Sequence, residues 1–86
     1  MEFEWDEDKR RRALDERGLD FADVVHFDLR SAHVFEDDRK EYGERRFIAF
    51  GYLFGRLCCL VFAHRGSRMR IVSLRKANER EKRKYG

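Results

Sequence analysis

Runs of apolar residues dominate the second half of the chain and predict a β-sheet there. Residues 46–53, 57–64 and 69–74 are rich in β-branched and aromatic side chains. Gly55 and Gly66 separate these runs at the spacing of β-hairpins. Three consecutive antiparallel strands are therefore expected between residues 46 and 74.

The first half of the chain has a mixed pattern that predicts a strand, two helices and another strand. Residues 3–5 alternate as a short strand, and Asp6 is a suitable N-cap for a helix that Gly18 ends. Asp20 can cap a second helix, and residues 31–38 indicate a further strand. Polar residues between this strand and the hairpins indicate a loop.

The whole order predicts a small α+β fold that occupies residues 1–86 as one domain. It comprises a short N-terminal strand, two helices, an antiparallel sheet of about four strands and a C-terminal helix over residues 76–85. A chain of 86 residues has room for a single core. No apolar run reaches the roughly 18 residues of a membrane span, and the acidic start lacks a leader pattern, so a cytoplasmic protein is expected.

The hairpin turns also predict a register and two sheet faces. With turns at 54–55 and 66–67, Leu53 faces Arg56 and His64 faces Met69. A slip of one residue would exchange the faces. We expect the helices to pack on the face that carries Ile48, Phe50, Tyr52, Leu57, Cys59, Val61, Ala63, Val72 and Leu74. The opposite face, with Phe47, Ala49, Gly51, Cys58, Leu60, Phe62, His64, Met69, Ile71, Ser73 and Arg75, is expected to be partly open and concave.

Aromatic side chains make up 14% of the chain, which is enough for a core even with 43% charged residues. In a domain of this size such side chains are needed for stability first. We therefore expect a core that includes Phe3, Trp5, Phe21, Phe27 and Phe35.

Charge is distributed unevenly along the chain. Residues 1–43 carry 8 Lys and Arg against 14 Asp and Glu, whereas residues 44–86 carry 12 against 3, so the net charges are −6 and +9. An arginine-rich half suits a polyanion, because the guanidinium fork matches phosphate. The alternative is a solvated surface whose charge the acidic half balances.

Metal and disulfide chemistry find little support in the sequence. Cys58 and Cys59 are adjacent and have no spaced Cys or His partners, so they are expected to be buried free thiols. The basic half contains no Asp, Glu and His cluster with the spacing of metal ligands. We predict no metal and no cofactor.

Short segments along nearly the whole chain resemble the BrnT family of bacterial type II toxins. The stretch from residues 65–66 to residues 75–77, together with Tyr85, is the most specific part. The matching segments are Phe3-Glu4-Trp5-Asp6, Lys9, Gly18, Phe21-Ala22, Tyr42-Gly43-Glu44, Arg46, Gly51, Gly55-Arg56, Arg65-Gly66, Arg70, Ile71, Ser73, Arg75, Lys76-Ala77, Glu81 and Tyr85.

The resemblance implies a RelE-like fold and a toxin that cleaves RNA and inhibits translation. It also implies neutralisation by a BrnA-type antitoxin with a ribbon-helix-helix domain. Operator DNA would then be contacted only through the toxin–antitoxin complex.

Three arginines at family positions are predicted to clamp the RNA backbone, namely Arg65, Arg70 and Arg75. Metal-free cleavage requires stabilisation of the extra negative charge on phosphorus, which arginine provides. Arg65 and Arg75 are the predicted catalytic arginines. Arg70, Lys9 and Lys76 are predicted RNA contacts, and the alternative for each is a surface charge or salt bridge.

Three further side chains are candidates for the chemistry. Glu81 and Tyr85 share one face of the last helix, where Glu81 would orient an arginine and Tyr85 would stack on a base or donate its hydroxyl group. The alternative is that this face docks the helix onto the sheet. His64 has the pKa range for general acid or base work, or it is a strand-end histidine with no special task.

Two other classes of function share these features. A nucleic-acid-binding module without catalysis would carry the same basic half. A structural interaction protein would use the basic half to bind an acidic partner and would have no affinity for RNA.

Overall fold

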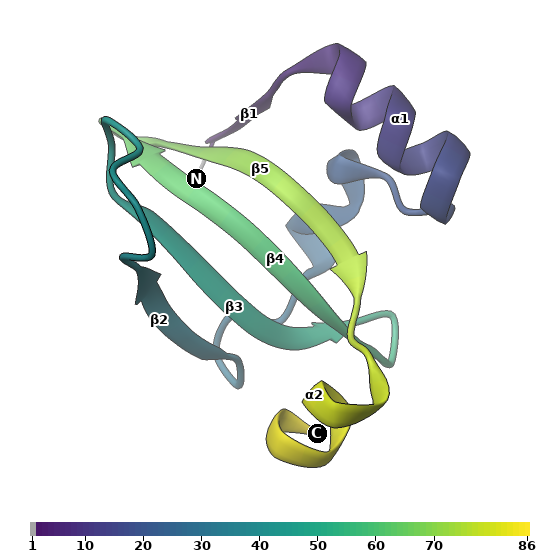
Figure 1. Ribbon diagram of the computed structural model, residues 1–86. Coiled ribbons are helices and arrows are strands. Elements are labelled where there is room, and N and C mark those ends of the chain that lie inside the picture. The colour runs from purple at the N-terminus through teal and green to yellow at the C-terminus, as the bar shows by residue number, and fades with distance from the viewer. Residues whose placement is uncertain (1) are drawn as a thin grey trace.

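The computed structural model describes residues 2–86 and shows an α+β domain built on one five-stranded sheet (Figure 1). The strand order in the sheet is β1-β5-β4-β3-β2. The strands are β1 (Glu2–Trp5), β2 (His33–Asp37), β3 (Arg46–Leu53), β4 (Arg56–Arg65) and β5 (Arg68–Lys76). The helical elements are α1 (Glu7–Arg17), the 3-10 helix η1 (Phe21–His26) and α2 (Glu79–Tyr85).

Helix boundaries follow the capping residues in the sequence. Asp6 accepts hydrogen bonds from the first backbone N–H groups of α1, and Gly18 ends that helix with a φ of 69°. Asp20 caps the next element, which is a 3-10 helix and not the predicted α-helix. The last helix begins later than predicted, because Asn78 and Glu81 form a capping box.

The N-terminal strand makes the sheet mixed, so the predicted antiparallel sheet of about four strands is corrected. β1 pairs in parallel with β5, from Glu2 beside Arg68 to Trp5 beside Ile71, and the other pairs are antiparallel. Phe3 and Trp5 pack against the core, which fixes β1 at this edge of the sheet.

Both predicted hairpin registers are confirmed. Leu53 lies opposite Arg56, and His64 lies opposite Met69. The first turn places Phe54 and Gly55 at φ angles of 51° and 77°, as a tight two-residue hairpin turn requires.

A bulge in β5 alters the alternation that the register alone would give. Val61 pairs with Ser73 and Phe62 pairs with Ile71, so Val72 is the extra residue between them. Leu74 therefore lies on the same face as Ile71 and is fully buried. Ser73 and Arg75 lie on the other face.

The predicted assignment of the two faces is wrong up to Ile71, whereas the bulge leaves Ser73, Leu74 and Arg75 on the faces predicted for them. α1 and η1 cover the face that was expected to be open, and their side chains join its core. The backbone of β3 closely approaches Phe27, the residue that follows η1, since a Cβ on Gly51 would lie 2.9 Å from its ring. Both faces of the central strands are apolar, so alternation did not show which one the helices cover. The buried core cluster consists of Ala13, Phe21, Val24, Phe27, Ala49, Leu53, Cys58, Leu60, Phe62, Met69, Ile71 and Leu74.

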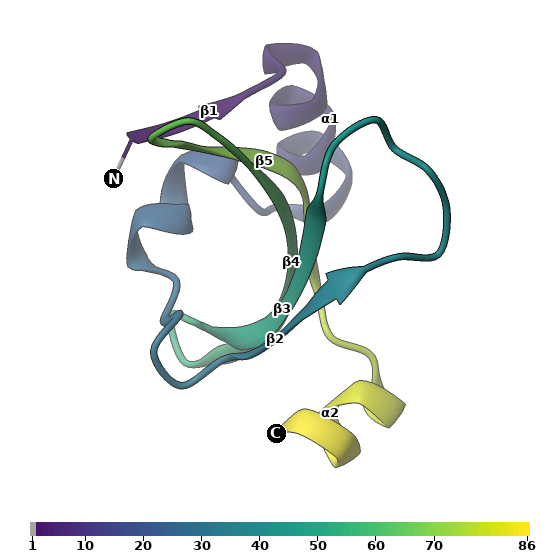
Figure 2. The ribbon, with the colours of Figure 1, turned by 90° about the vertical axis from the view of Figure 1, so that its left-hand side faces the viewer.

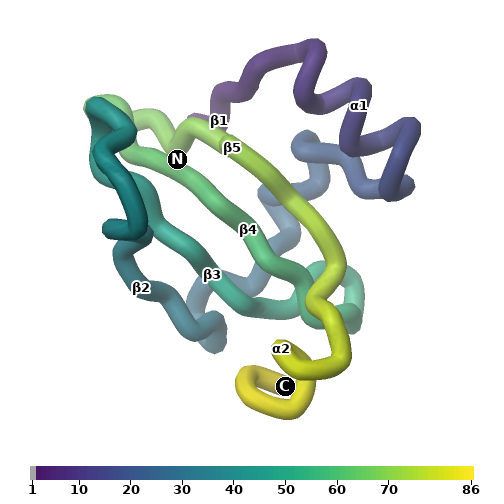
Figure 3. The backbone as a smooth tube through the Cα atoms, viewed as in Figure 1, coloured from purple at the N-terminus to yellow at the C-terminus, as the bar shows by residue number. Residues whose placement is uncertain are grey.

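The opposite surface of the sheet, which we call the open face, carries Phe35, Phe50, Cys59, Ser73 and Arg75. Figure 2 shows the sheet edge-on as a curve, with η1 inside it and α2 beyond its outer side. The tube in Figure 3 runs from β5 directly into α2, which lies below the ends of β3 and β4. The short C-terminal helix is thus the helical element of the open face.

Most predicted core aromatics are confirmed. Phe21 and Phe27 are buried, and Phe3 and Trp5 are partly buried against them. Phe35 was predicted to be core but is 42% exposed, because it lies on the open face of the edge strand β2.

Within residues 2–86, no helix is both long and apolar enough to cross a membrane.

Candidate functional site

A hollow of about 480 Å³ lies on the open face between the sheet and α2. Strands β2 to β5, the loop after β2 and helix α2 all contribute to it. Three of the predicted site residues line it, namely Arg75, Glu81 and Tyr85. The other lining residues are Phe35, Arg39, Ile48, Phe50, Cys59, Val61, Ser73, Arg80 and Lys84.

Arg75 and Glu81 form a two-pronged ion pair at the hollow. Nη1 and Nη2 of Arg75 each donate a hydrogen bond of 2.8 Å to a different carboxylate oxygen of Glu81. Glu81 also accepts from the backbone N–H of Asn78. The hydrogen bonds from Arg75 lower the pKa of Glu81 to about 2, so the carboxylate is ionised at neutral pH. The Arg75 side chain remains 41% exposed, so it can reach a ligand in the hollow.

Tyr85 fixes the C-terminal end of α2 to the sheet. Its ring stacks on Phe50 with centroids 4.3 Å apart and planes 6° from parallel. His33 and Phe35 of β2 approach the same ring, at 5.4 Å and 6.3 Å. The face that holds Glu81 and Tyr85 therefore docks the helix onto the sheet and also lines the hollow.

Arg39 reaches the hollow from the loop that follows β2. It donates two side-chain hydrogen bonds of 2.7 and 2.8 Å to Asp37, whose side chain is only 2% exposed. The hydroxyl group of Tyr42 donates to the same carboxylate. These hydrogen bonds, that of Arg39 foremost, hold the pKa of Asp37 well below its usual range. The buried carboxylate thus anchors Arg39 in the hollow.

The predicted clamp of three arginines does not form as one cluster. Arg70 precedes Arg75 by five positions on β5, which corresponds to roughly 15 Å along a strand. Arg70 lies 3.8 Å from Glu4, and Arg65 lies 3.2 Å from Glu44. Burial alone would raise the pKa of Glu44, but hydrogen bonds from Arg65 and Arg46 lower it. These arginines share the open face with Arg75 but occupy its opposite end.

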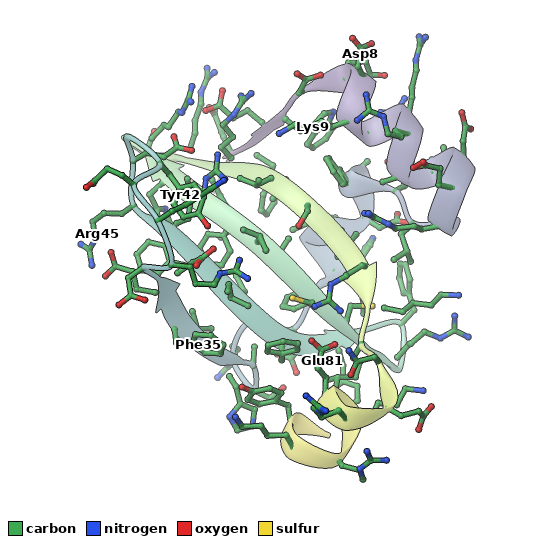
Figure 4. All side chains as sticks on the ribbon, viewed as in Figure 1. Asp8, Lys9, Phe35, Tyr42, Arg45 and Glu81 are labelled. Carbon is green, nitrogen blue, oxygen red and sulfur yellow. The ribbon has the colours of Figure 1, made fainter. Side chains whose placement is uncertain are left out.

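The three remaining candidates lie outside the hollow. His64 is exposed on the face that α1 and η1 cover, with its ring edge-on to Phe62 at 5.6 Å. Lys76 is exposed at the end of β5, opposite Cys58. Lys9 on α1 lines a smaller hollow of about 150 Å³ beside β5, which Ser73 also lines. Figure 4 shows Lys9 on α1, well apart from Glu81 on α2.

Several cationic and aromatic residues of the hollow were missed by sequence reasoning. Arg80 and Lys84 each precede a predicted residue of α2 by one position, and helical spacing of four places them together. That spacing was a usable signal. Phe35 and Phe50 were missed because the two sheet faces were exchanged. No pattern in the sequence indicated that Arg39 lines the hollow, because its position depends on an irregular loop.

Metal-ligating side chains do not gather in the described chain. Over residues 2–86, no group of three or more His, Cys, Asp or Glu residues is arranged to hold a metal ion. Cys58 and Cys59 are buried free thiols, as expected, and burial raises the pKa of both.

The fold and the hollow define a small α+β protein with a cation-rich, aromatic-lined site on one face of its sheet. Residues 5–81 match the family model described as the ribonuclease toxin BrnT of type II toxin-antitoxin systems, so the chain belongs to this family. The resemblance drawn from the sequence is thereby confirmed. A search of curated proteins finds no match. The family gives RNA as the class of substrate and an antitoxin as the partner.

Proposed function

We propose that this toxin is a metal-independent endoribonuclease with its active site in the hollow on the open face. The observation that carries the proposal is the exposed guanidinium of Arg75, held by Glu81 in a hollow with three other cationic side chains. Phosphodiester cleavage adds negative charge to the oxygens on phosphorus in the transition state. Preoriented arginines stabilise such charge, because they need no rearrangement during the reaction.

The cleavage step proceeds by attack of the RNA 2′-oxygen on the adjacent phosphorus. The 2′-hydroxyl loses its proton, the bond from phosphorus to the 5′-oxygen breaks, and that oxygen leaves with a proton. The products are a 2′,3′-cyclic phosphate and a 5′-hydroxyl. Arg75 binds the non-bridging oxygens during this step, and Arg39 and Arg80 contact the same or a neighbouring phosphate.

Glu81 serves as the positioning residue for Arg75. A carboxylate with a pKa of about 2 is a weak base at neutral pH, so orientation of the guanidinium suits it better than proton abstraction. Tyr85 is held by Phe50 with its ring at the hollow. Its hydroxyl group donates its proton to the leaving 5′-oxygen and takes up the proton that the 2′-hydroxyl loses, so the protonation of Tyr85 is unchanged after the step. His64 lies on the other face of the sheet, so the proposal gives it no part in this step.

Basic residues beyond the hollow extend the RNA-binding surface. Arg65 and Arg70 lie on the open face, and Lys9 lies across β5. Lys76 lies at the end of β5, next to Arg75. Each of these side chains contacts a phosphate away from the cleaved bond, which adds affinity without sequence preference.

Incubation of labelled RNA with the purified toxin in EDTA tests the proposal. We expect cleavage in EDTA and products that end in a 2′,3′-cyclic phosphate. Binding without cleavage would instead identify a nucleic-acid-binding module. Absence of both would leave an interaction protein whose basic half has another acidic partner.

The biological consequence of the proposal is inhibition of translation in the cytoplasm, with neutralisation by a BrnA-type ribbon-helix-helix antitoxin. Expression of the toxin alone should arrest growth, and co-expression of such an antitoxin should restore it. Arg75→Ala should not arrest growth when it accumulates to the same level.

A further inference from the structure

Phe35 presents an open aromatic ring at the edge of the hollow. It is 42% exposed, and its ring lies 6.1 Å from Phe50 and 6.3 Å from Tyr85, at 26° to each. Phe50 is buried and stacks on Tyr85. The three rings form a cluster in which Phe35 keeps free surface. Figure 4 shows Phe35 on β2.

Cationic side chains line the same hollow as this ring. Arg39 follows β2 directly and is held by Asp37, while Arg80 and Lys84 reach the hollow from α2. A flat apolar surface next to fixed positive charge matches a nucleotide, which has a planar base and an anionic phosphate. Stacking on an aromatic side chain is a main way in which proteins hold unpaired bases.

Resting on the function proposed above, we infer that Phe35 is the stacking platform for an unpaired base next to the phosphate that Arg75 binds. The substrate class is therefore single-stranded RNA. In a duplex, each base is stacked on both sides by its neighbours and turned toward its pairing partner. Such a base has no free face for Phe35, so a duplex binds only through its phosphates and 2′-hydroxyl groups.

A tryptophan at this position reports the contact directly. Trp5 is the only native tryptophan, and it lies in β1, at the opposite edge of the sheet. The matched control is Val34→Trp, because Val34 is 47% exposed and pairs with Ala49 on the other face of the same strands. The probe is a single-stranded RNA with 2′-O-methyl groups, which lacks the hydroxyl needed for cleavage, and its duplex with a complementary strand.

We expect the single strand to quench the added fluorescence of Phe35→Trp, and neither the duplex nor the Val34→Trp protein to show the effect. Phe35→Ala should bind the single strand about 5- to 150-fold more weakly, whereas Phe35→Tyr and Val34→Ala should bind normally. Equal quenching by the duplex, or full affinity of Phe35→Ala, overturns the inference. If the stacking test fails but Arg75→Ala still abolishes cleavage, the proposed nuclease function stands and only the role of Phe35 is refuted. If the native protein binds no RNA at any salt concentration, the nuclease function and the role of Phe35 are both refuted.

Discussion

Arg75 and Glu81 connect the end of β5 to the first turn of α2 through two hydrogen bonds of 2.8 Å. Glu81 also belongs to the capping box of α2, so a single carboxylate both starts the helix and orients the arginine. The position of α2 on the open face and the geometry of the hollow therefore depend on the same side chain.

Glu81→Gln should make the stability of the domain less sensitive to acid. The pKa of Glu81 is lowered from 4.5 to about 2, so its ionised form stabilises the fold above pH 4.5. This stabilisation is lost as the pH falls from 4.5 toward 2. The Tm of the native protein should fall across that window by more than the Tm of Glu81→Gln.

Glu79→Gln is the control for this comparison, because the Glu79 side chain is 79% exposed. The other carboxylates with lowered pKa values are present in all three proteins. The difference in Tm between two of the proteins at each pH therefore reports only the substituted carboxylate. Parallel curves for the native and Glu81→Gln proteins would contradict the role of the ion pair.

Tyr85→Phe should separate packing from chemistry. The ring remains and can still stack on Phe50, so the Tm should not change. Loss of the hydroxyl group should slow cleavage by about 10²-fold, as for removal of a proton-transfer group. Tyr52→Phe, at a half-exposed tyrosine outside the hollow, should cleave normally. Full activity of Tyr85→Phe would restrict Tyr85 to docking of α2.

Arg65→Ala and Arg70→Ala should weaken RNA binding and leave the cleavage step intact. Each arginine lies far along the open face from Arg75 and contacts a different phosphate in the proposed complex. Each variant should reduce the slope of log affinity against log salt by about 0.7 on a single strand. Rates at saturating RNA should equal the native rate, and a large loss there would place these arginines at the cleaved bond.

Gly51→Ala tests which face of the sheet the helices cover. The added Cβ would lie 2.8 Å from the Cβ of Ala32 and 2.9 Å from the ring of Phe27. Such overpacking costs about 1–3 kcal/mol, and each kcal/mol lowers the Tm of a domain this size by about 4–8 °C. Ser73→Ala on the open face should melt near the native temperature. An unchanged Tm for Gly51→Ala would contradict this packing.

Local signals in the sequence predicted more of the fold than of the site. Cap residues such as Asp6 and Gly18 and the glycine turns act over a few residues, so the order of the elements and the hairpin registers were correct, whereas the type of η1 and the start of α2 were not. The choice of buried face depends on how the helices pack on a sheet that is apolar on both sides. The bulge at Val72 reversed the alternation after Ile71, so Leu74 and Arg75 lie on the predicted faces although the residues before them do not.

The candidate site was predicted where its residues are close in sequence. Arg75, Glu81 and Tyr85 lie within eleven positions at the junction of β5 and α2, and they line one hollow. Arg65 and Arg70 were grouped with them by chemistry, but the length of β5 separates them. Arg39 and Phe35 reach the same hollow from the β2 edge of the sheet. They are brought there by the pairing of β2 with β3, which the sequence did not reveal.

Single-turnover cleavage of single-stranded RNA in EDTA, at saturating protein, is the sharpest test of an active site built around Arg75. Arg75→Ala should cleave about 10²- to 10³-fold more slowly than the native protein, and Arg75→Lys should recover only part of the loss because it lacks the guanidinium fork. Arg83→Ala is the matched control, since Arg83 lies in α2 but is not among the residues that line the hollow, and it should cleave at the native rate. A native rate for Arg75→Ala would contradict the placement of the active site in this hollow.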